Sequence, residues 1–476
     1  DHSFNIRVKT GSGDDKVNIR ETLHNADSRI RIETRAGNDT VLIDDEATLE
    51  GIDSTIEVDT GTGTQDVLTI LDSIDTSNGN NGTLTQNTLV GLGIQNANHV
   101  WYDNVESLNL ELGSGNDVLT VESTHAHQTS IKSNAGNDTT HIQTISGATR
   151  VETGAGDDLT RVQSINNTLN SIAAQLTIDG GTENHTDHLI LNDSGDVEGD
   201  NSTATLNNNS FEGFGSQRIH YTSMETLTLQ INSLTDNLTV DDTHAGTTNI
   251  KVGEGESGEG EAGEGECVGP VSGIQINNTS GETTITSGDT SNPEEYISFG
   301  NNDAGVDFAN DFFLTSQCGV TLLTISDITN HVGNEFTISV SPTDSHKTLI
   351  SNLDDREIGF INIDALIVNA SDFADTINIA STSSFTTIEV ISGDDDDIFN
   401  VQSISAATTL RTGDHNDTVN IHSDQTMEQI QENLTVYTQS GFDTINISDA
   451  ADGSFQTGTL TSTELTGLGI GTAHSI

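Results

Sequence analysis

The sequence predicts an all-β protein, an elongated parallel β-solenoid with coils of about 20 residues grouped in supermodules of about 120 residues. Three observations support this fold: a glycine-rich turn that recurs along the chain, a nearly regular alternation of apolar and polar residues after it, and an unusual composition. Of 476 residues, 32% are hydrophobic and only 4% aromatic, while Gly numbers 46 and Pro only 3. Such a chain lacks the aromatic residues of a large globular core but suits a thin aliphatic column between short strands.

The recurring turn has the form Gly-x-Gly-x-Asp. It is clearest at 11–15 (GSGDD), 113–117 (GSGND) and 154–158 (GAGDD), and shorter versions end at Asp39 and Asp138. Later copies centre on Asp375, Asp397, Asp417 and Asp443, and weaker ones on Asp66, Asp187 and Asp236. Glycine at these positions supplies the positive φ that a tight turn into a strand needs.

Each turn leads into a strand with one buried face. The second and fourth residues after the Asp are nearly always apolar, as Leu119 and Val121 are, and the third is mostly polar, as Thr120 is. A period of two indicates a strand. Helical periodicity is nearly absent, and 165–175 is the best candidate for a short helical turn.

The spacing of the turns predicts the coil. Asp117, Asp138 and Asp158 follow one another at nearly equal intervals, and Asp397 and Asp417 are separated by the same interval. Each interval contains a second short strand, such as 148–152. Two strands and two turns in about 20 residues make one coil, and parallel coils stack about 4.8 Å apart.

A longer period is superimposed on the coils. Gly-Leu-Gly or Gly-Phe-Gly turns recur at 89–94, 211–215 and 465–470, and aromatic strands recur around Tyr102, Tyr221 and Phe360. We interpret these aromatic residues as plugs in a wider part of the column. The predicted organisation has four parts: 1–80, coils of a partial first supermodule; 81–252, the second supermodule; 253–320, an acidic Gly/Glu-rich insertion; and 321–476, a truncated third supermodule.

The insertion contains an alternating Glu/Gly run that should repel itself and stay outside the stack. It also contains both cysteines of the chain, Cys267 and Cys318. A disulfide between them in an oxidising compartment is expected, with two free thiols as the alternative.

Stacking would place the turn carboxylates in a row, each near its copy in the next coil. Unscreened, such a row is repulsive by about 1 kcal/mol or more for each neighbouring pair. A hard dication bound between the carboxylates would turn this repulsion into attraction. Ca²⁺ takes six to eight oxygen ligands from carboxylates and turn carbonyls.

The motif resembles the calcium-binding nonapeptide of the repeats-in-toxin family, a Gly-Gly-x-Gly-x-Asp turn followed by an aliphatic strand. The resemblance implies a β-roll that binds Ca²⁺ between its turns, although here each coil carries a single motif. The residues that the resemblance assigns to the metal are Asp14, Asp15, Asn38, Asp39, Asn116, Asp117, Asn137, Asp138, Asp157, Asp158, Asp396, Asp397, Asn416 and Asp417. The alternative is a purely structural turn, in which rows mixing Asn and Asp persist by side-chain hydrogen bonds alone.

The charge excludes some partners. With 74 Asp and Glu against 15 Lys and Arg, the formal net charge is −59, which excludes a nucleic-acid binder and argues against anionic lipid. No apolar run approaches the roughly 20 residues of a membrane helix. The supermodule resembles segments of very large secreted repeat proteins such as bacterial adhesins. Further repeats of a longer chain and other copies in a filament are therefore the expected partners.

We interpret the chain as a structural or adhesive extracellular protein, a segment of a surface fibre stiffened by Ca²⁺, and not as an enzyme. The alternative is a module that binds glycans or a partner protein. A polysaccharide-acting β-helix enzyme is disfavoured because Lys and Arg are scarce and no carboxylate pair stands out among so many.

Asn-x-Ser/Thr sequons are frequent and would accept glycans on a suitable secretory route. The sites outside the predicted metal turns are Asn81, Asn166, Asn184, Asn192, Asn201, Asn208, Asn237, Asn277, Asn278, Asn369, Asn433 and Asn446. We expect Asn446 to be used, because it lies at an outward position of its strand.

Overall fold

The computed structural model is all-β, as the sequence predicts. It describes the chain except for residues 1–4, 23–27, 45, 95–97, 182–184, 197–202, 232–236, 253–272, 288–295, 300–306, 309–311, 321, 327–334, 354–355, 423–424 and 472–473. No helical segment that could span a bilayer occurs among the described residues. The predicted helical turn at 165–175 is wrong: this stretch forms two tight turns, with bonds such as Ile172 N–H to Leu169 O, 2.9 Å.

The chain divides into two units. The first comprises 1–196 and 209–230, and the second comprises 197–208 and 231–476. In both units, strands pair in parallel with strands from the neighbouring repeats, and each chain segment contributes alternately to different ladders.

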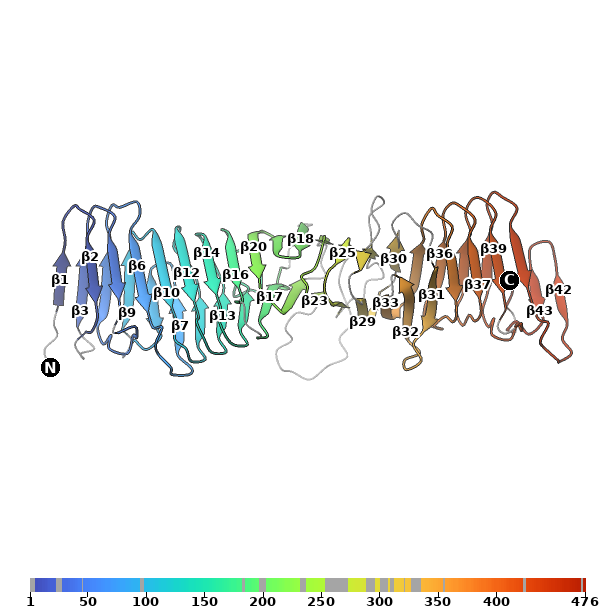
Figure 1. Ribbon diagram of the computed structural model, residues 1–476, viewed down its shortest axis with the longest axis horizontal. Coiled ribbons are helices and arrows are strands. Elements are labelled where there is room, and N and C mark those ends of the chain that lie inside the picture. The colour runs from blue at the N-terminus through green and yellow to red at the C-terminus, as the bar shows by residue number, and fades with distance from the viewer. Residues whose placement is uncertain are drawn as a thin grey trace. The chain divides into compact units, whose positions relative to one another are not determined.

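Three parallel ladders make up most of the first unit (Figure 1). The first ladder contains β1 (Asn5–Lys9), β3 (Arg29–Glu33), β5 (Thr55–Asp59) and β9 (His99–Asp103). The second contains β2 (Lys16–Ile19), β4 (Thr40–Ile43), β6 (Val67–Leu71), β10 (Ser107–Glu111), β12 (Gln128–Lys132), β14 (Thr149–Glu152), β16 (Leu176–Asp179) and β20 (Ser216–Thr222). The third contains β7 (Asn81–Leu84), β11 (Val118–Val121), β13 (Thr139–Ile142), β15 (Leu159–Val162) and β17 (His188–Asp193). Outside these ladders are β8 (Thr88–Gly91), antiparallel to β7 and β9, and β19 (Ser210–Gly213), antiparallel to β20. β21 (Thr226–Ile231) is the hydrogen-bonded neighbour of β17 in the sheet of the third ladder.

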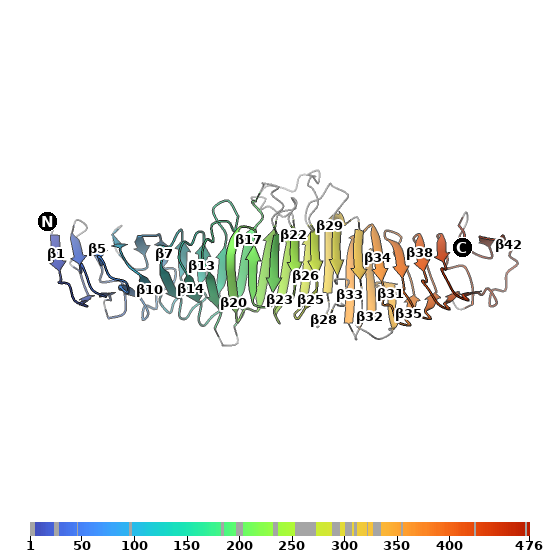
Figure 2. The same cartoon turned by 90° about the horizontal axis from the view of Figure 1, so that it is seen from above.

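The second unit also has three ladders. Figure 2 shows its strands from above. The first contains β18 (Thr203–Asn207), β22 (Asn237–Val240), β24 (Gly273–Ile276), β27 (Tyr296–Phe299), β30 (Leu322–Ser326), β34 (Ala365–Asn369), β36 (Thr387–Ile391), β38 (Thr408–Arg411) and β40 (Leu434–Tyr437). The second contains β23 (Thr247–Val252), β26 (Thr283–Ser287), β29 (Phe312–Val320) and β33 (Arg356–Ile363). The third contains β31 (Glu335–Val340), β35 (Thr376–Ile379), β37 (Ile398–Val401), β39 (Thr418–Ile421) and β41 (Thr444–Ile447). Smaller pairings are β32 (Lys347–Leu353), antiparallel to β31 and β33, β25 (Asn278–Thr279) with β28 (Asp307–Phe308), and β42 (Gly458–Leu460) with β43 (Leu465–Gly467).

The register of these ladders has the spacing that the sequence predicts. Leu119 pairs with Thr140, and Thr140 in turn pairs with Thr160, so paired residues are separated by the same interval as the Asp turns. Within the predicted insertion 253–320, the described strands β24, β26, β27 and β29 are rungs of the same ladders. The Glu/Gly run and Cys267 lie outside the described residues, so the disulfide with Cys318 stays a prediction.

The core consists of the residues that the alternation placed inward. Leu119 and Val121 are both 0% exposed, and the inward residues of neighbouring rungs are buried in the same way. A fully buried Ile, Leu or Val side chain contributes about 1.5–3 kcal/mol, so each rung adds a similar increment to stability. The aromatic residues Tyr102, Tyr221 and Phe360 are also buried, as predicted, at 1% exposure each.

Candidate functional site

The predicted metal residues form two columns that differ in burial. The second residue of each predicted pair belongs to the inner column, which we define as Asp15, Asp39, Asp66, Asp117, Asp138, Asp158, Asp187, Asp375, Asp397, Asp417 and Asp443. The first residues form the outer column, which we define as Asp14, Asn38, Asn116, Asn137, Asp157, Asp396 and Asn416. All seven outer residues are exposed, whereas most inner carboxyls are nearly inaccessible, as with Asp39 at 0%.

Inner-column carboxylates join successive coils by accepting backbone hydrogen bonds. The N–H of Asp117 donates to Oδ1 of Asp138 (2.7 Å), whose own N–H donates to Oδ1 of Asp158 (2.7 Å). The same contact joins Asp375 to Asp397 (2.7 Å) and Asp397 to Asp417 (3.0 Å). Every bond of the column therefore runs from an earlier N–H to a later carboxylate.

Two of the inner runs end on a glutamate. The N–H of Asp66 donates to Oε2 of Glu106 (2.8 Å), and the N–H of Asp187 donates to Oε2 of Glu225 (2.8 Å). Each Glu lies four residues after a buried tyrosine, Tyr102 or Tyr221. The Glu side chain, which is longer than that of Asp, thus accepts the N–H of the last Asp in each series, next to the strand that carries the buried tyrosine.

Hydrogen bonds of the outer column run in the opposite direction. The N–H of Asn137 donates to Oδ1 of Asn116 (2.8 Å), and the N–H of Asp157 donates to Oδ1 of Asn137 (3.1 Å). Asn and Asp serve equally here, because an exposed side-chain oxygen is all that the contact needs. This is the hydrogen-bonded row that the sequence left open as the alternative to calcium.

Left-handed backbone positions create this arrangement. Gly154 and Gly156, four and two residues before Asp158, have φ of 102° and 134°, and a Cβ on either would lie within 2.0 Å of a carbonyl oxygen of the preceding coil. Glycine therefore allows successive turns to approach closely enough for the side-chain contacts above.

Several inner carboxyls keep one oxygen that is buried without a hydrogen-bond partner in the described part of the chain. These residues are Asp39, Asp117, Asp138, Asp158, Asp397 and Asp417. Burial is the main cause that raises the pKa of Asp138 and Asp397 to about 7 and that of Asp158 to about 6. Such a group resists ionisation unless a positive charge or a proton neutralises it.

A serine or threonine hydroxyl lies beside some of these carboxyls, and Ser392 is the one beside Asp397. The Ser392 hydroxyl donates its hydrogen to the carbonyl oxygen of Thr412 (2.9 Å). Its oxygen can therefore only accept a further bond, and a protonated Asp397 could supply that hydrogen. The geometry suits a neutral carboxylic acid at this position.

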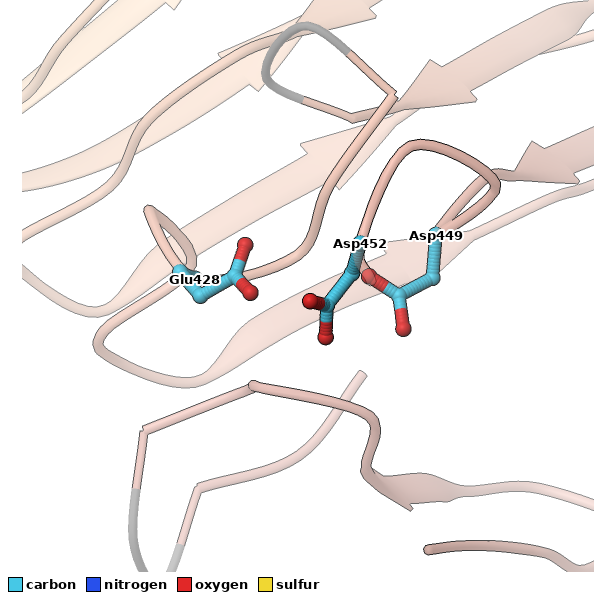
Figure 3. Close-up of side chains that lie close together, drawn as sticks. All are labelled: Glu428, Asp449 and Asp452. Carbon is cyan, nitrogen blue, oxygen red and sulfur yellow. The ribbon is translucent and has the colours of Figure 1, made fainter. Parts of the chain in front are cut away.

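The structure does not gather three inner carboxylates around one point in the part of the chain that it describes. The single set of three metal-ligating side chains within 4.8 Å among those residues is Glu428, Asp449 and Asp452, which Figure 3 shows on neighbouring turns. Sequence reasoning missed this set, because its members come from different coils and follow no repeat. All three side chains are half-buried, and Gln456 donates to both Glu428 (3.3 Å) and Asp452, so the set also works as a hydrogen-bonded turn.

Most predicted glycosylation sites are at the surface. Asn81, Asn166, Asn208, Asn237, Asn433 and Asn446 are exposed, and Asn277 and Asn369 are half-buried. Asn192 is 0% exposed, and its Nδ2 donates to Oε1 of Gln163 (2.8 Å). Asn184 and Asn201 lie outside the described residues.

Comparisons with known proteins place no further constraint on the site. No protein-family model matches the chain, and no curated protein matches its sequence.

Proposed function

We propose that the chain is a structural segment of an extracellular surface fibre or filament, built as a parallel β-solenoid whose turns are joined by the inner column. The observation that carries this proposal is the row of turn contacts in successive coils, each linking an inner Asp N–H to the next Asp carboxylate. Such contacts repeat every coil and add stiffness along the stack. They occupy the Gly-x-Gly-x-Asp turns, which are the most regular part of the sequence.

The arrangement favours a structural role over a catalytic one. Catalytic carboxyls act in pairs or trios around a substrate, with surroundings that differ from one member to the next. Here the same residue type recurs in the same surroundings, so no inner Asp is distinguished from its neighbours. We therefore propose that the chain is not an enzyme.

Calcium is the second part of the proposal. At neutral pH, each buried oxygen without a donor must be neutralised by a proton or by a cation, and Ca²⁺ accepts carboxylate and carbonyl ligands readily. Because the pKa of Asp138 and of Asp397 is raised to about 7, a proton neutralises these carboxyls near pH 6, whereas above pH 8 they are ionised and can bind the cation. Both ways of neutralising the column are compatible with a structural rod.

Thermal unfolding at about pH 8, with Ca²⁺ or with a chelator, tests the metal. Bound Ca²⁺ should stabilise the folded chain in proportion to ln(1 + [Ca²⁺]/Kd) and raise its melting temperature, and Mg²⁺ at equal concentration should do less. An identical melting temperature with calcium and with chelator overturns calcium binding, but leaves the structural role intact.

Cryo-electron microscopy of the purified chain tests the structural role. The proposal expects particles in which rungs repeat about every 4.8 Å along one axis. Compact particles without this repeat would overturn it, and so would turnover of acidic polysaccharides by the purified chain.

A further inference from the structure

A stack of two exposed aromatic rings lies on the surface of the second unit. The centroids of the Phe385 phenyl ring and the His346 imidazole are 4.2 Å apart, with 19° between the ring planes. Phe385 is 54% exposed, and the His346 side chain is 49% exposed. Because the imidazole covers one face of the phenyl ring, the exposed area of Phe385 includes the opposite face. The stack therefore presents a flat apolar surface to solvent.

Hydrogen bonds hold together the two turns that carry these rings. His346 lies at the tip of the hairpin between β31 and β32, where the Oδ1 of Asp344 accepts its N–H (2.9 Å) and lies 3.5 Å from its Nδ1. Phe385 lies in the turn between β35 and β36, and its N–H donates to the Oγ of Ser383 (3.3 Å). Ser383 in turn donates to the carbonyl oxygen of Ser345 (3.1 Å). The stack is thus fixed from both of its sides.

The turn that carries Phe385 is built like an earlier turn of the repeat. The Oγ1 of Thr382 accepts an N–H from the turn after β37 (2.7 Å), and the Oγ1 of Thr124 accepts one from the turn after β13 (3.0 Å). The third residue after each threonine is an exposed ring, Phe385 in one turn and His127 in the other. β35 pairs with β31 on one side and with β37 on the other, so the Phe385 turn does not lie at an open edge of its ladder.

The stack borders a polar hollow. Ser345 and Ser384, the residues next to the two rings in the sequence, both line an open hollow of about 490 Å³. Six of its nine lining residues are Ser or Thr, and Gln431 and Glu432 contribute an amide and a carboxylate. Within the described part of the chain, the side chains of Ser384, Ser405 and Gln431 make no hydrogen bond. Their hydroxyl and amide groups are therefore available to a ligand.

The composition of the lining favours a neutral ligand with many hydroxyl groups. Neither Lys nor Arg is among the described residues that line the hollow, and the Oε2 of Glu432 lies 3.2 Å from the Nδ1 of His474. An anionic ligand would meet this carboxylate in a chain whose net charge is −59. A wholly apolar ligand would displace water from the hydroxyls without replacing its hydrogen bonds. A hexose ring satisfies both surfaces, because it has an apolar C–H face and a rim of hydroxyls.

An exposed phenylalanine alone would not indicate a site, since much of any protein surface is apolar. Phe373, in the turn before β35, is 42% exposed and has no aromatic partner in the described part of the chain. Phe385 differs from it in two ways, because its ring is held by a second ring and it adjoins a hollow with free hydroxyl and amide groups. These two features together are typical of a small-molecule site with an apolar wall and a few polar groups.

We propose that Phe385 and the adjoining hollow bind a neutral polysaccharide of hexose units. One sugar ring stacks on the free face of the phenyl ring, and its hydroxyls bind Ser384, Ser405 and Gln431. The site lies on the side of the ladders, where strand pairing along the stack leaves it open. It goes beyond the proposed structural function, which does not depend on it, and adds a glycan as a lateral partner.

Isothermal titration calorimetry of the full chain with neutral hexasaccharides tests the site. The probes are laminarihexaose, cellohexaose, mannohexaose and galactohexaose. At least one should bind with a Kd of about 1 mM, and raising the salt to about 0.5 M should change that Kd by less than about twofold. Phe385→Ala should raise the Kd at least tenfold, because it removes the stacking face, whereas Phe385→Tyr keeps the ring and should stay within about threefold.

Phe373→Ala is the matched control, since it removes the same side chain from an exposed turn outside the hollow, and it should leave the Kd unchanged. Circular dichroism checks that the variants fold, and Gln431→Ala, which removes only an exposed amide, is the second variant and should also raise the Kd.

Four outcomes would each overturn the proposal: binding of none of the four probes, an unchanged Kd in Phe385→Ala, equal losses in Phe385→Ala and Phe373→Ala, or tighter and salt-sensitive binding of polygalacturonate. Sedimentation velocity in which the chain self-associates and Phe385→Ala does not would also overturn it, because the ring would then contact a second copy. None of these results affects the axial repeat expected by electron microscopy, so the site can fail while the structural role stands.

Discussion

Asp397→Asn should stabilise the folded chain above neutral pH. Asp397 is 1% exposed; its Oδ1 accepts the Asp375 N–H, and its Oδ2 is buried without a partner in the described residues. Asparagine keeps an oxygen for the Asp375 N–H and replaces the second oxygen with an amide that can donate to Ser392. The substitution therefore removes a buried acid while keeping the contact between coils.

The size of the stabilisation by Asp397→Asn follows from the pKa of Asp397. Burial chiefly, and then the neighbouring Asp375 and Asp417 charges, raise the pKa of Asp397 from 3.8 to about 7. Between about pH 4 and pH 7, the Asp397 carboxyl holds a proton in the folded state that it has lost in the unfolded state. The free energy of unfolding therefore falls as the pH rises from about 4 to about 7. At about 1.36 kcal/mol for each pKa unit, the loss is at most about 4 kcal/mol above pH 7. Because coupled neighbours share protons, about 2 kcal/mol is a realistic gain for the variant.

Urea unfolding at about pH 4.5, 6 and 8, in the presence of chelator, measures the effect. The two proteins should have similar stability at the lowest pH, and the variant should lead increasingly as the pH rises. Asp396→Asn is the matched control: it makes the same chemical change at the adjacent exposed residue and should shift stability by less than about 0.5 kcal/mol at each pH. A stability of the unmodified chain that rises from pH 4.5 to 8, or equal effects of both variants, would refute the buried neutral acid.

Three further substitutions test the packing of the coils by urea unfolding. Gly413→Ala should destabilise the folded chain by about 2 kcal/mol or more, since φ at Gly413 is 79° and a Cβ would lie 1.6 Å from the Gly393 carbonyl oxygen. Gly453→Ala, in open space, should change the free energy of unfolding little. Equal effects of the two substitutions would contradict the close approach of the turns. Phe399→Ala should cost about 3–5 kcal/mol of stability because the side chain is fully buried. Phe385→Ala, at a side chain that is 54% exposed, should cost less than about 1 kcal/mol. A loss under about 1 kcal/mol at Phe399 would refute its assignment to the core. Glu225→Ala should lower the free energy of unfolding by about 1–3 kcal/mol, because it leaves the Asp187 N–H without its acceptor. Glu225→Gln keeps an acceptor oxygen and should retain most of that stability. A Gln variant as unstable as the Ala variant would show that the charge of Glu225 matters more than the hydrogen bond.

The strands and their buried faces could be predicted because the information is local. Leu119 and Val121 are inward because they alternate with polar residues directly after a turn, and both are fully buried. The coil length follows from the distance between one turn and the next. Neither inference requires knowledge of which segments meet in space.

The antiparallel excursions and the direction of the hydrogen bonds could not be predicted in this way. β5 pairs with β9, although β7 and β8 come between them in the sequence. β8 pairs antiparallel with both β9 and β7, and no periodic signal in the sequence marks this detour. From sequence alone, Asp157 and Asp158 also have the same predicted role. Their separation into an exposed acceptor and a buried acid depends on the positive φ of Gly154 and Gly156, which turns one side chain outward and its neighbour inward.

This separation changes how the extreme acidity should be understood. The formal charge of −59 counts every Asp and Glu as ionised. Exposed acids of the outer column and the strand surfaces can carry that charge in water at little cost. Inner residues such as Asp138 and Asp397 lose hydration on folding, and their pKa of about 7 means that they share protons near neutral pH. A stack of carboxyls that would repel one another when ionised can thus hold successive turns together, and the pH or cation concentration around the proposed fibre would set how firmly it does so.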